Sequence, residues 1–246
     1  MLKKKGSIFF NIEQKKQTDA DIIAAIVFGS DQGLVGQFND VVADFTVKTL
    51  TKLPGSAKIW AVGERVHSSL IDSGLSLVEH FDVPNSVKAI TPLIGQILIE
   101  TEKLYVTGEI TELYLFYNRP TSGAKYETVS QRLLPLDEEW GQKLSDLTWP
   151  TKNLPEVIGE GNTTLRALIR EYIFISLFRA CAESLASENA SRLAAMQRAD
   201  KNIDEMLNDL NGAFHRLCQS SIDEELFDVI SGFESLSSFH SLLEYN

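Results

Sequence analysis

The last third of the sequence contains almost no residues that stop a helix. Proline is absent after Pro155, and the only glycines after Gly161 are Gly212 and Gly232. Proline and glycine are the strongest helix breakers, so nothing interrupts a helix from about Thr163 onward. An apolar run of the ~18 residues that a membrane span needs is also missing, as is an apolar signal core at the beginning. These absences predict a soluble, cytoplasmic chain with a very long helix.

A surplus of basic residues is missing as well, because the net charge is −11. Nucleic acids are bound by neutralising phosphates, so no nucleic-acid partner is expected. Cysteine is scarce, and the two that occur, Cys181 and Cys218, lie about 55 Å apart along the expected helix. That separation excludes a disulfide between them, and both are interpreted as small packing residues.

No pattern predicts a catalytic, cofactor-binding or metal-binding site. Ser30 and Asp31 lack the frame of a nucleophilic serine, so a helix-capping role is expected for them. The histidines have no i, i+4 histidine partner and no nearby cysteine, which predicts no metal centre. They are His67, His80, His215 and His240. A group of carboxylates is interpreted as a solvated or partner-facing stripe rather than as catalytic acids. These are Asp223, Glu224, Glu225 and Asp228.

The segment FGSDQGLVGQFND, residues 28–40, stands between an expected strand and an expected helix, where a dinucleotide site would place its phosphate loop. Its glycines, Gly29, Gly33 and Gly36, have the wrong spacing for that fingerprint, and no Lys-Ser or Lys-Thr pair follows them. A tight strand-to-helix turn is the preferred interpretation, with nucleotide binding as the alternative.

Apolar runs alternate with helical patterns between residues 22 and 155, which is typical of an α/β domain. The expected strands are 22–28, 58–62 and 112–118, and a hairpin joins 113–119 to 126–134. The expected helices lie around 38–45, 65–71 and 87–105. The predicted fold class is a small Rossmann-like α/β domain with a terminal β-hairpin and a very long C-terminal helix. The expected divisions are a leader at 1–20, the α/β domain at 21–155 and the helix at 156–246, with an irregular linker within 137–162.

Apolar residues of the long helix recur at alternating spacings of three and four, the pattern of a coiled-coil seam. Its first part comprises Leu165, Leu168, Tyr172, Ile175, Ala182, Ala186 and Leu193. The second part, called the seam below, comprises Met196, Ile203, Leu207, Leu210, Phe214, Leu217, Ile222, Leu226 and Val229. The spacing shifts by about one residue after Leu217, as a local discontinuity in a supercoil does. The pattern predicts one half of a coiled coil.

Two stretches of this helix resemble the C-terminal helix of the gamma subunit of rotary F-type ATP synthases. They are ASENASRLAAMQRADKN (186–202) and QSSIDEELFDVISGF (219–233). FGSDQGLVGQFND resembles the segment after that family's first strand, and QRLLPL (131–136) resembles the end of its hairpin. The similarity covers roughly residues 21–237, which is most of the chain.

The resemblance implies a non-catalytic central-stalk subunit that couples ion-driven rotation to ATP synthesis or hydrolysis and carries no cofactor. The implied partners are the alpha and beta subunits of the ATPase head, the epsilon subunit and the membrane rotor ring of c subunits. The implied location is peripheral, on the cytoplasmic face of a bacterial-type energy-transducing membrane. In that family the distal helix engages a catch loop of the catalytic subunit. The matching positions, called the catch residues below, are Cys218, Gln219, Asp223 and Glu225.

The sequence departs from the family pattern at several of these places. Cys218 stands where arginine is usual, Asp223 where threonine is usual, and Phe233 where alanine is usual. Gln32 replaces a common arginine. These departures point to a divergent branch, such as the alternative sodium-translocating ATPases. The family also begins with a helix of several dozen residues, whereas about 20 residues precede the first strand here, so most of that helix is expected to be lacking.

Two alternatives to an assembled rotor subunit remain open from the sequence. One is a shortened derivative that does not assemble with the ATPase head. The other is an adaptor whose helix recruits an unrelated helical partner. This alternative stays open because the spacing of a seam predicts a coiled coil but does not identify the partner helix.

Overall fold

The computed structural model describes residues 22–122, 125–136 and 158–243, together with the single residues 141, 146 and 156. The expected leader at 1–20, most of the expected linker at 137–162 and Gly123 of the expected hairpin turn lie outside these ranges. The last two residues of the expected linker already belong to the long helix, which begins at Gly161. The chain divides into two compact units, Met1–Ala195 and Met196–Asn246, so it is described unit by unit. The first unit includes the beginning of the long helix as well as the α/β domain.

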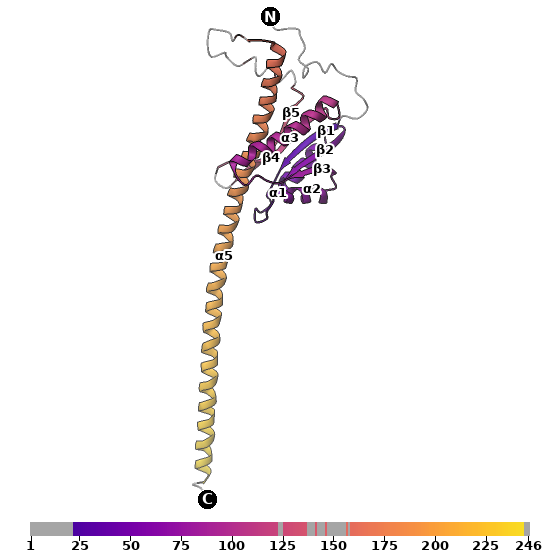
Figure 1. The fold of residues 1–246 in the computed structure, drawn as a ribbon. Coiled ribbons are helices and arrows are strands. Elements are labelled where there is room, and N and C mark those ends of the chain that lie inside the picture. The colour runs from indigo at the N-terminus through magenta and orange to yellow at the C-terminus, as the bar shows by residue number, and fades with distance from the viewer. Residues whose placement is uncertain are drawn as a thin grey trace. The chain divides into compact units, whose positions relative to one another are not determined.

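The first unit is built on a five-stranded sheet with the order β3-β2-β1-β4-β5 (Figure 1). β1 pairs in parallel with β2 and β4, β2 pairs in parallel with β3, and β4 pairs with β5 as an antiparallel hairpin. The strands are β1 (Ile22–Phe28), β2 (Ser56–Val62), β3 (Leu77–Phe81), β4 (Glu112–Pro120) and β5 (Tyr126–Leu134). The helices are α1 (Phe38–Leu50), α2 (Glu64–Asp72), α3 (Val87–Thr107) and α5 (Gly161–Leu243). The predicted fold class is therefore confirmed.

The sequence pattern missed one strand, β3. It has only five residues, and its three central residues are exposed while Leu77 and Phe81 are half-buried. As the edge strand it lacks the buried apolar run that marked β1, β2 and β4. A strand with so few buried side chains gives almost no periodic signal.

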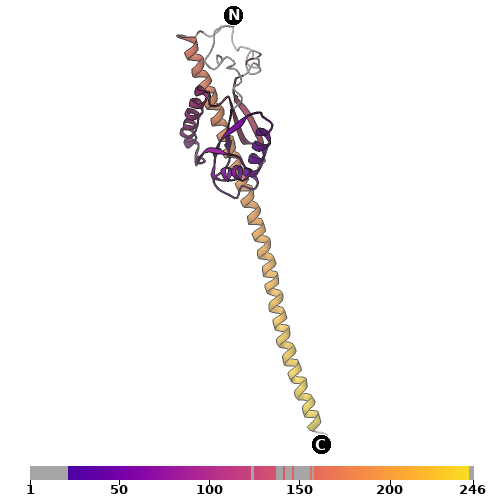
Figure 2. The ribbon, with the colours of Figure 1, turned by 90° about the vertical axis from the view of Figure 1, so that its right-hand side faces the viewer.

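Helices cover both faces of the sheet because alternate residues of each strand point to opposite sides. Ala24, Ile26 and Phe28 of β1 pack in a cluster with α3 and the beginning of α5. Ile23, Ala25 and Val27 pack in a second cluster with α1 and α2. Figures 1 and 2 show α3 on one side of the sheet and α1 and α2 on the other. The central strands are buried on both faces, which explains their continuous apolar sequences.

The first segment of α5, residues 161–195, buries a different stripe from the one that the sequence suggested. Ile169, Ile173, Leu177 and Cys181 are buried against the sheet and α3. The predicted stripe lies on a neighbouring face, where Leu165, Leu168, Ile175 and Leu193 are exposed. The stripe that was predicted to form a coiled coil is therefore not the main one that packs against the sheet, and the buried stripe was not identified from the sequence. The segment carries two apolar faces, and the core covers mainly one of them. From the predicted stripe, Tyr172 and Ala182 are partly buried against the same cluster.

The loop after β1 is held by polar side chains. The backbone N–H of Ser30 donates to Asn39 Oδ1 at 2.9 Å, and Asn39 Nδ2 donates to Ser30 Oγ at 2.8 Å. Asp31 accepts hydrogen bonds from the backbone N–H groups of Glu64 at 3.0 Å and Val83 at 2.9 Å. The helix-capping role predicted for Ser30 and Asp31 is wrong, because the N-cap residues of α1 and α2 are Gln37 and Gly63. Asp31 instead accepts a hydrogen bond from the first N–H group of α2 across the fold.

Glycine is required at two points of this corner. A Cβ added at Gly29 would lie 2.3 Å from Val66 Cβ on α2, so only glycine permits this approach of strand and helix. Gly63 has φ 118° and packs against the Ser30 backbone, where any side chain would be strained. Close packing thus accounts for Gly29 without a bound phosphate.

No helix among the described residues combines the length and the hydrophobicity needed to cross a membrane.

Candidate partner-binding surface

The second segment of α5, residues 196–234, carries the predicted seam on its surface. All nine seam residues are exposed, from 49% at Met196 to 71% at Leu217. Four further apolar residues, Met206, Phe227, Ile230 and Phe233, enlarge the exposed apolar surface. Soluble monomers rarely expose contiguous apolar patches larger than a few hundred Å². The segment therefore has the composition of an interface and not of a solvated helix.

The catch residues are also exposed, and they lie on both sides of the seam. At about 100° per residue, Cys218 and Glu225 fall on one flank of the last part of the seam, Ile222 to Val229, and Gln219 and Asp223 fall on the other. The apolar stripe continues between the two flanks. A partner that covers the stripe would therefore meet two pairs of polar groups, one on each side. Cys218 is not buried, so the packing role predicted for it is wrong within this chain, whereas that of Cys181 is confirmed.

The second segment of α5 is strongly acidic. Residues 196–234 contain nine aspartates and glutamates and three basic residues, and the last basic residue is Arg216. Like charges repel, so two such helices would pair poorly, and a partner with basic side chains beside its apolar stripe would fit better. The charge pattern therefore favours a partner helix that carries basic side chains beside its apolar stripe.

The first segment of α5 is fastened to the sheet by polar contacts at its C-terminal end. Ser187 Oγ donates to the backbone oxygen of Asn118 at 3.0 Å, at the end of β4. Asn118 Nδ2 in turn donates to the backbone oxygen of Phe38 at 2.9 Å. All of these groups are buried. Buried hydrogen bonds with specific geometry fix the register of the helix on the sheet, because slippage would leave their partners unpaired.

Glu188 is a buried carboxylate in the same place. Its Oε1 accepts a hydrogen bond from Arg192 Nη2 at 2.6 Å. Burial raises the pKa of Glu188 above its usual value; Arg192 opposes this shift, and the charge of Asp31 adds to it. A raised folded-state pKa means that this group favours folding at low pH and that its contribution is lost as the pH rises through the raised value.

Replacing Glu188 with glutamine should therefore flatten the dependence of stability on pH above the unfolded value of 4.5. The check is the urea midpoint of the wild type and E188Q across pH 5 to 8. E205Q, which removes an exposed glutamate paired with Lys201, serves as the control and should leave the pH profile unchanged. If the urea midpoint depends on pH equally in the wild type and in E188Q, burial does not disfavour ionisation of the Glu188 carboxyl group, which contradicts the prediction.

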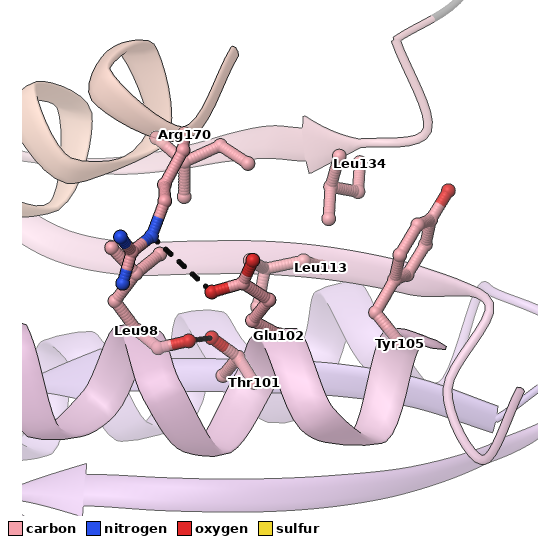
Figure 3. A pocket seen from close by; sticks show the side chains of 8 residues that line it. Leu98, Thr101, Glu102, Tyr105, Leu113, Leu134 and Arg170 are labelled. Carbon is pink, nitrogen blue, oxygen red and sulfur yellow. Dashed lines mark hydrogen bonds and ion pairs between the residues drawn. The ribbon is translucent and has the colours of Figure 1, made fainter. Parts of the chain in front are cut away.

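A small cavity lies where α3, the hairpin and α5 meet (Figure 3). Its volume is about 20 Å³, and its walls are almost entirely apolar, with Leu98, Leu113 and Leu134 among the lining residues. An ion pair between Arg170 Nε and Glu102 Oε2, 3.3 Å long, lies beside it. A space of about one water volume whose exposed walls are almost entirely apolar is a gap in packing and not a ligand site.

The two cysteines should differ in reactivity. Burial, with a smaller contribution from Glu188, raises the pKa of Cys181 to about 12, so its thiolate is scarce at neutral pH. Cys218 is exposed. We expect iodoacetamide at pH 8 to alkylate Cys218 in the folded chain and to spare Cys181 until urea is added. Peptide mass spectrometry checks this, and equal labelling of both thiols in the folded chain would contradict the burial of Cys181.

The family model described as ATP synthase matches residues 3–236. The ATP synthase gamma chain of Rhizobium johnstonii is 30% identical, over 94% of this chain and 83% of the relative. The gamma chain of Clostridium pasteurianum is 29% identical, over 85% of this chain and 72% of the relative. The chain belongs to the ATP synthase gamma chain family.

Solved structures of mitochondrial ATP synthases contain chains with a similar fold. A chain of the Euglena gracilis mitochondrial ATP synthase, from a structure of OSCP, F1 and c-ring, has a TM-score of 0.61 and 16% identity. The match covers 88% of this chain and 73% of that one. A chain from the central stalk and c-ring structure of the Tetrahymena thermophila enzyme has a TM-score of 0.54 and 20% identity, covering 76% of this chain and 80% of that one.

The resemblance inferred from the sequence motifs is thus confirmed. As a gamma chain, the protein is a central-stalk subunit of an ATP synthase and not a catalytic one. The alternative of an unrelated coiled-coil adaptor is not favoured. The relevant surface is accordingly one that contacts other proteins, and the acidic second segment of α5 is the candidate.

Proposed function

We propose that this gamma chain transmits torque between a membrane rotor ring of c subunits and a catalytic head of alpha and beta subunits. The observation that carries the proposal is the exposed seam on the second segment of α5 in a member of this family. The alpha and beta subunits are proposed to surround this segment. The α/β unit is proposed to contact the epsilon subunit and the c ring, at the membrane face of the complex.

The proposed mechanism needs no chemistry from this chain. A ligand or partner shifts an equilibrium only by its differential affinity for the states involved. A helix with an apolar stripe on one face and acidic groups on others is asymmetric about its axis, so it would contact three similar catalytic sites differently. Each rotational position would favour a different conformation at each site, and linkage makes this coupling reciprocal.

The seam is proposed to pair with a second helix, which would cover the stripe from Met196 to Val229. The excess of acidic residues along this segment favours a mate with basic flanking positions. The catch residues would remain at the flanks, available to a loop of the catalytic subunit. With a cysteine at 218 and an aspartate at 223, this chain offers carboxylates and no arginine there, so the loop is expected to supply donors.

Co-purification tests the proposal. The tagged full chain is expressed with alpha and beta subunits of a related enzyme, captured and assayed for ATP hydrolysis. We expect the head subunits to be recovered and ATP hydrolysis to depend on them, with no turnover by the captured chain alone. Recovery of other coiled-coil proteins without any head subunit would favour the adaptor alternative and overturn the rotor assignment.

A further inference from the structure

The buried face of the first segment of α5 changes its chemistry towards the C-terminal end of that segment. Up to Cys181 the face is apolar, and it packs against the sheet and α3. One turn later the same face continues with polar side chains that are just as buried. They are Ser184, Ser187, Glu188 and Ser191, which are between 1% and 7% exposed. Their spacings of three and four keep them on one side of the helix, in line with Cys181. A helix that only had to pack on the sheet would carry apolar residues here.

Two polar contacts join this stretch of α5 to the end of β4, and together they are called the junction below. Ser187 Oγ donates to the backbone oxygen of Asn118 at 3.0 Å. Arg119 Nε lies 3.4 Å from Glu183 Oε2, and Arg179 Nε holds Glu183 Oε1 from within α5 at 2.7 Å. Polar contacts depend on direction, whereas apolar packing does not. The junction therefore opposes rotation and sliding of α5 on the sheet more specifically than the apolar contacts do.

The strand side of the junction is itself anchored. Asn118 Nδ2 donates to the backbone oxygen of Phe38 at 2.9 Å, and Asn118 Oδ1 accepts from Thr128 Oγ1 at 2.7 Å. The first bond leads to the start of α1, and the second leads to the neighbouring strand β5. A force that acts on Ser187 is therefore passed to three elements of the α/β domain and not to β4 alone.

The polar groups around the junction are poorly satisfied. Among the described residues, six buried side-chain nitrogen and oxygen atoms have no hydrogen-bond partner, and all six lie between residues 183 and 192 of α5 or on Arg119 opposite. They belong to Arg119, Glu183, Ser184, Glu188, Ser191 and Arg192. A buried polar atom without a hydrogen bond lowers stability, and apolar residues of similar size are often at least as stable in such places. Stability alone therefore does not explain why this stretch is polar.

We propose that the junction holds α5 against rotation and sliding on the sheet while torque passes through the chain, with Ser187, Glu183 and Arg119 as positioning residues. The inference rests on the proposed function, in which torque passes between the second segment of α5 and the α/β domain. Because α5 is one continuous helix, a turning force on its second segment acts on the junction. A rotated helix would leave the Asn118 oxygen and the Glu183 carboxylate without their partners, and buried polar groups resist such a loss.

The test compares ion transport with ATP hydrolysis in the assembled enzyme. The full chain is assembled with the head and membrane subunits of a related enzyme in sealed vesicles. A voltage-sensitive dye, which reports the transport of any cation, follows the membrane potential that ATP generates. The variant R119M/E183L/S187A removes both contacts of the junction. We expect this variant to bind the head and to hydrolyse ATP like the wild type, because its second segment of α5 is unchanged, but to lose most of the membrane potential.

The matched control is L177A, which removes buried apolar packing from the same face of α5 and leaves both polar contacts in place. Urea unfolding gives the stability of each variant. L177A should lose stability and still generate the wild-type potential for each ATP hydrolysed. An equal loss of potential in L177A would attribute the effect to stability and overturn the inference, and so would a normal potential in R119M/E183L/S187A. If the wild-type chain neither binds the head nor supports transport, the proposed function fails and this inference fails with it.

Discussion

Aspartate in place of Leu210 is expected to prevent the chain from assembling with the ATPase head. Leu210 is in the middle of the seam and is 67% exposed in the chain alone, so the substitution leaves the folded chain nearly undisturbed. In the proposed coiled coil the same position is covered, and a buried, unpaired carboxylate costs several kcal/mol. Every ~1.4 kcal/mol is a factor of ten in affinity, so recovery of head subunits should fall more than tenfold.

The control for this substitution is N208D, which adds the same charge two residues away and outside the seam. Asn208 is exposed, and N208D should assemble like the wild type. Circular dichroism of both purified variants establishes that the helix persists. Normal assembly of L210D would contradict burial of the seam in the complex, whereas equal loss in both variants would indicate a general effect of negative charge.

Alanine in place of Leu177 should destabilise the α/β unit by about 2–5 kcal/mol, the range for truncating a fully buried leucine. Leu177 is 0% exposed and belongs to the cluster that joins α5 to the sheet. Urea unfolding, followed by the fluorescence of the buried Trp60, measures the change. The prediction tests which face of α5 packs on the sheet.

The matched variant is L168A, on the stripe that periodicity alone had suggested. Leu168 is 63% exposed, so its truncation should change the free energy of unfolding by no more than about 0.5 kcal/mol. A larger cost for L168A than for L177A in the isolated chain would reverse the assignment of the two faces.

Much of the fold followed from local sequence signals. β1 was predicted with its observed bounds because its side chains are buried almost throughout. The long helix was predicted because no proline and few glycines occur within it. β3 was missed for the opposite reason, since its central side chains are exposed and an edge strand is defined by its neighbour.

The sequence pattern could not predict features that depend on the packing of segments that are distant in the sequence. The first segment of α5 carries two apolar stripes, one with Leu168 and Ile175 and one with Ile169 and Ile173, and periodicity does not indicate which of them the sheet covers. His67 and His80 looked isolated because no local spacing relates them, but a helix and the strand that follows it bring them together. The seam was identifiable because its spacing is local, while the identity of its mate is not encoded in that spacing.

The most direct test of the central claim is photo-crosslinking from Cys218, the exposed thiol among the catch residues. The thiol is labelled with a short benzophenone maleimide, the chain is assembled with the head subunits, and the adducts are identified by mass spectrometry after irradiation. The account predicts adducts with the alpha or beta subunits of the head. Assembled complexes in which the probe at Cys218 crosslinks to neither subunit would contradict the placement of this segment inside the head.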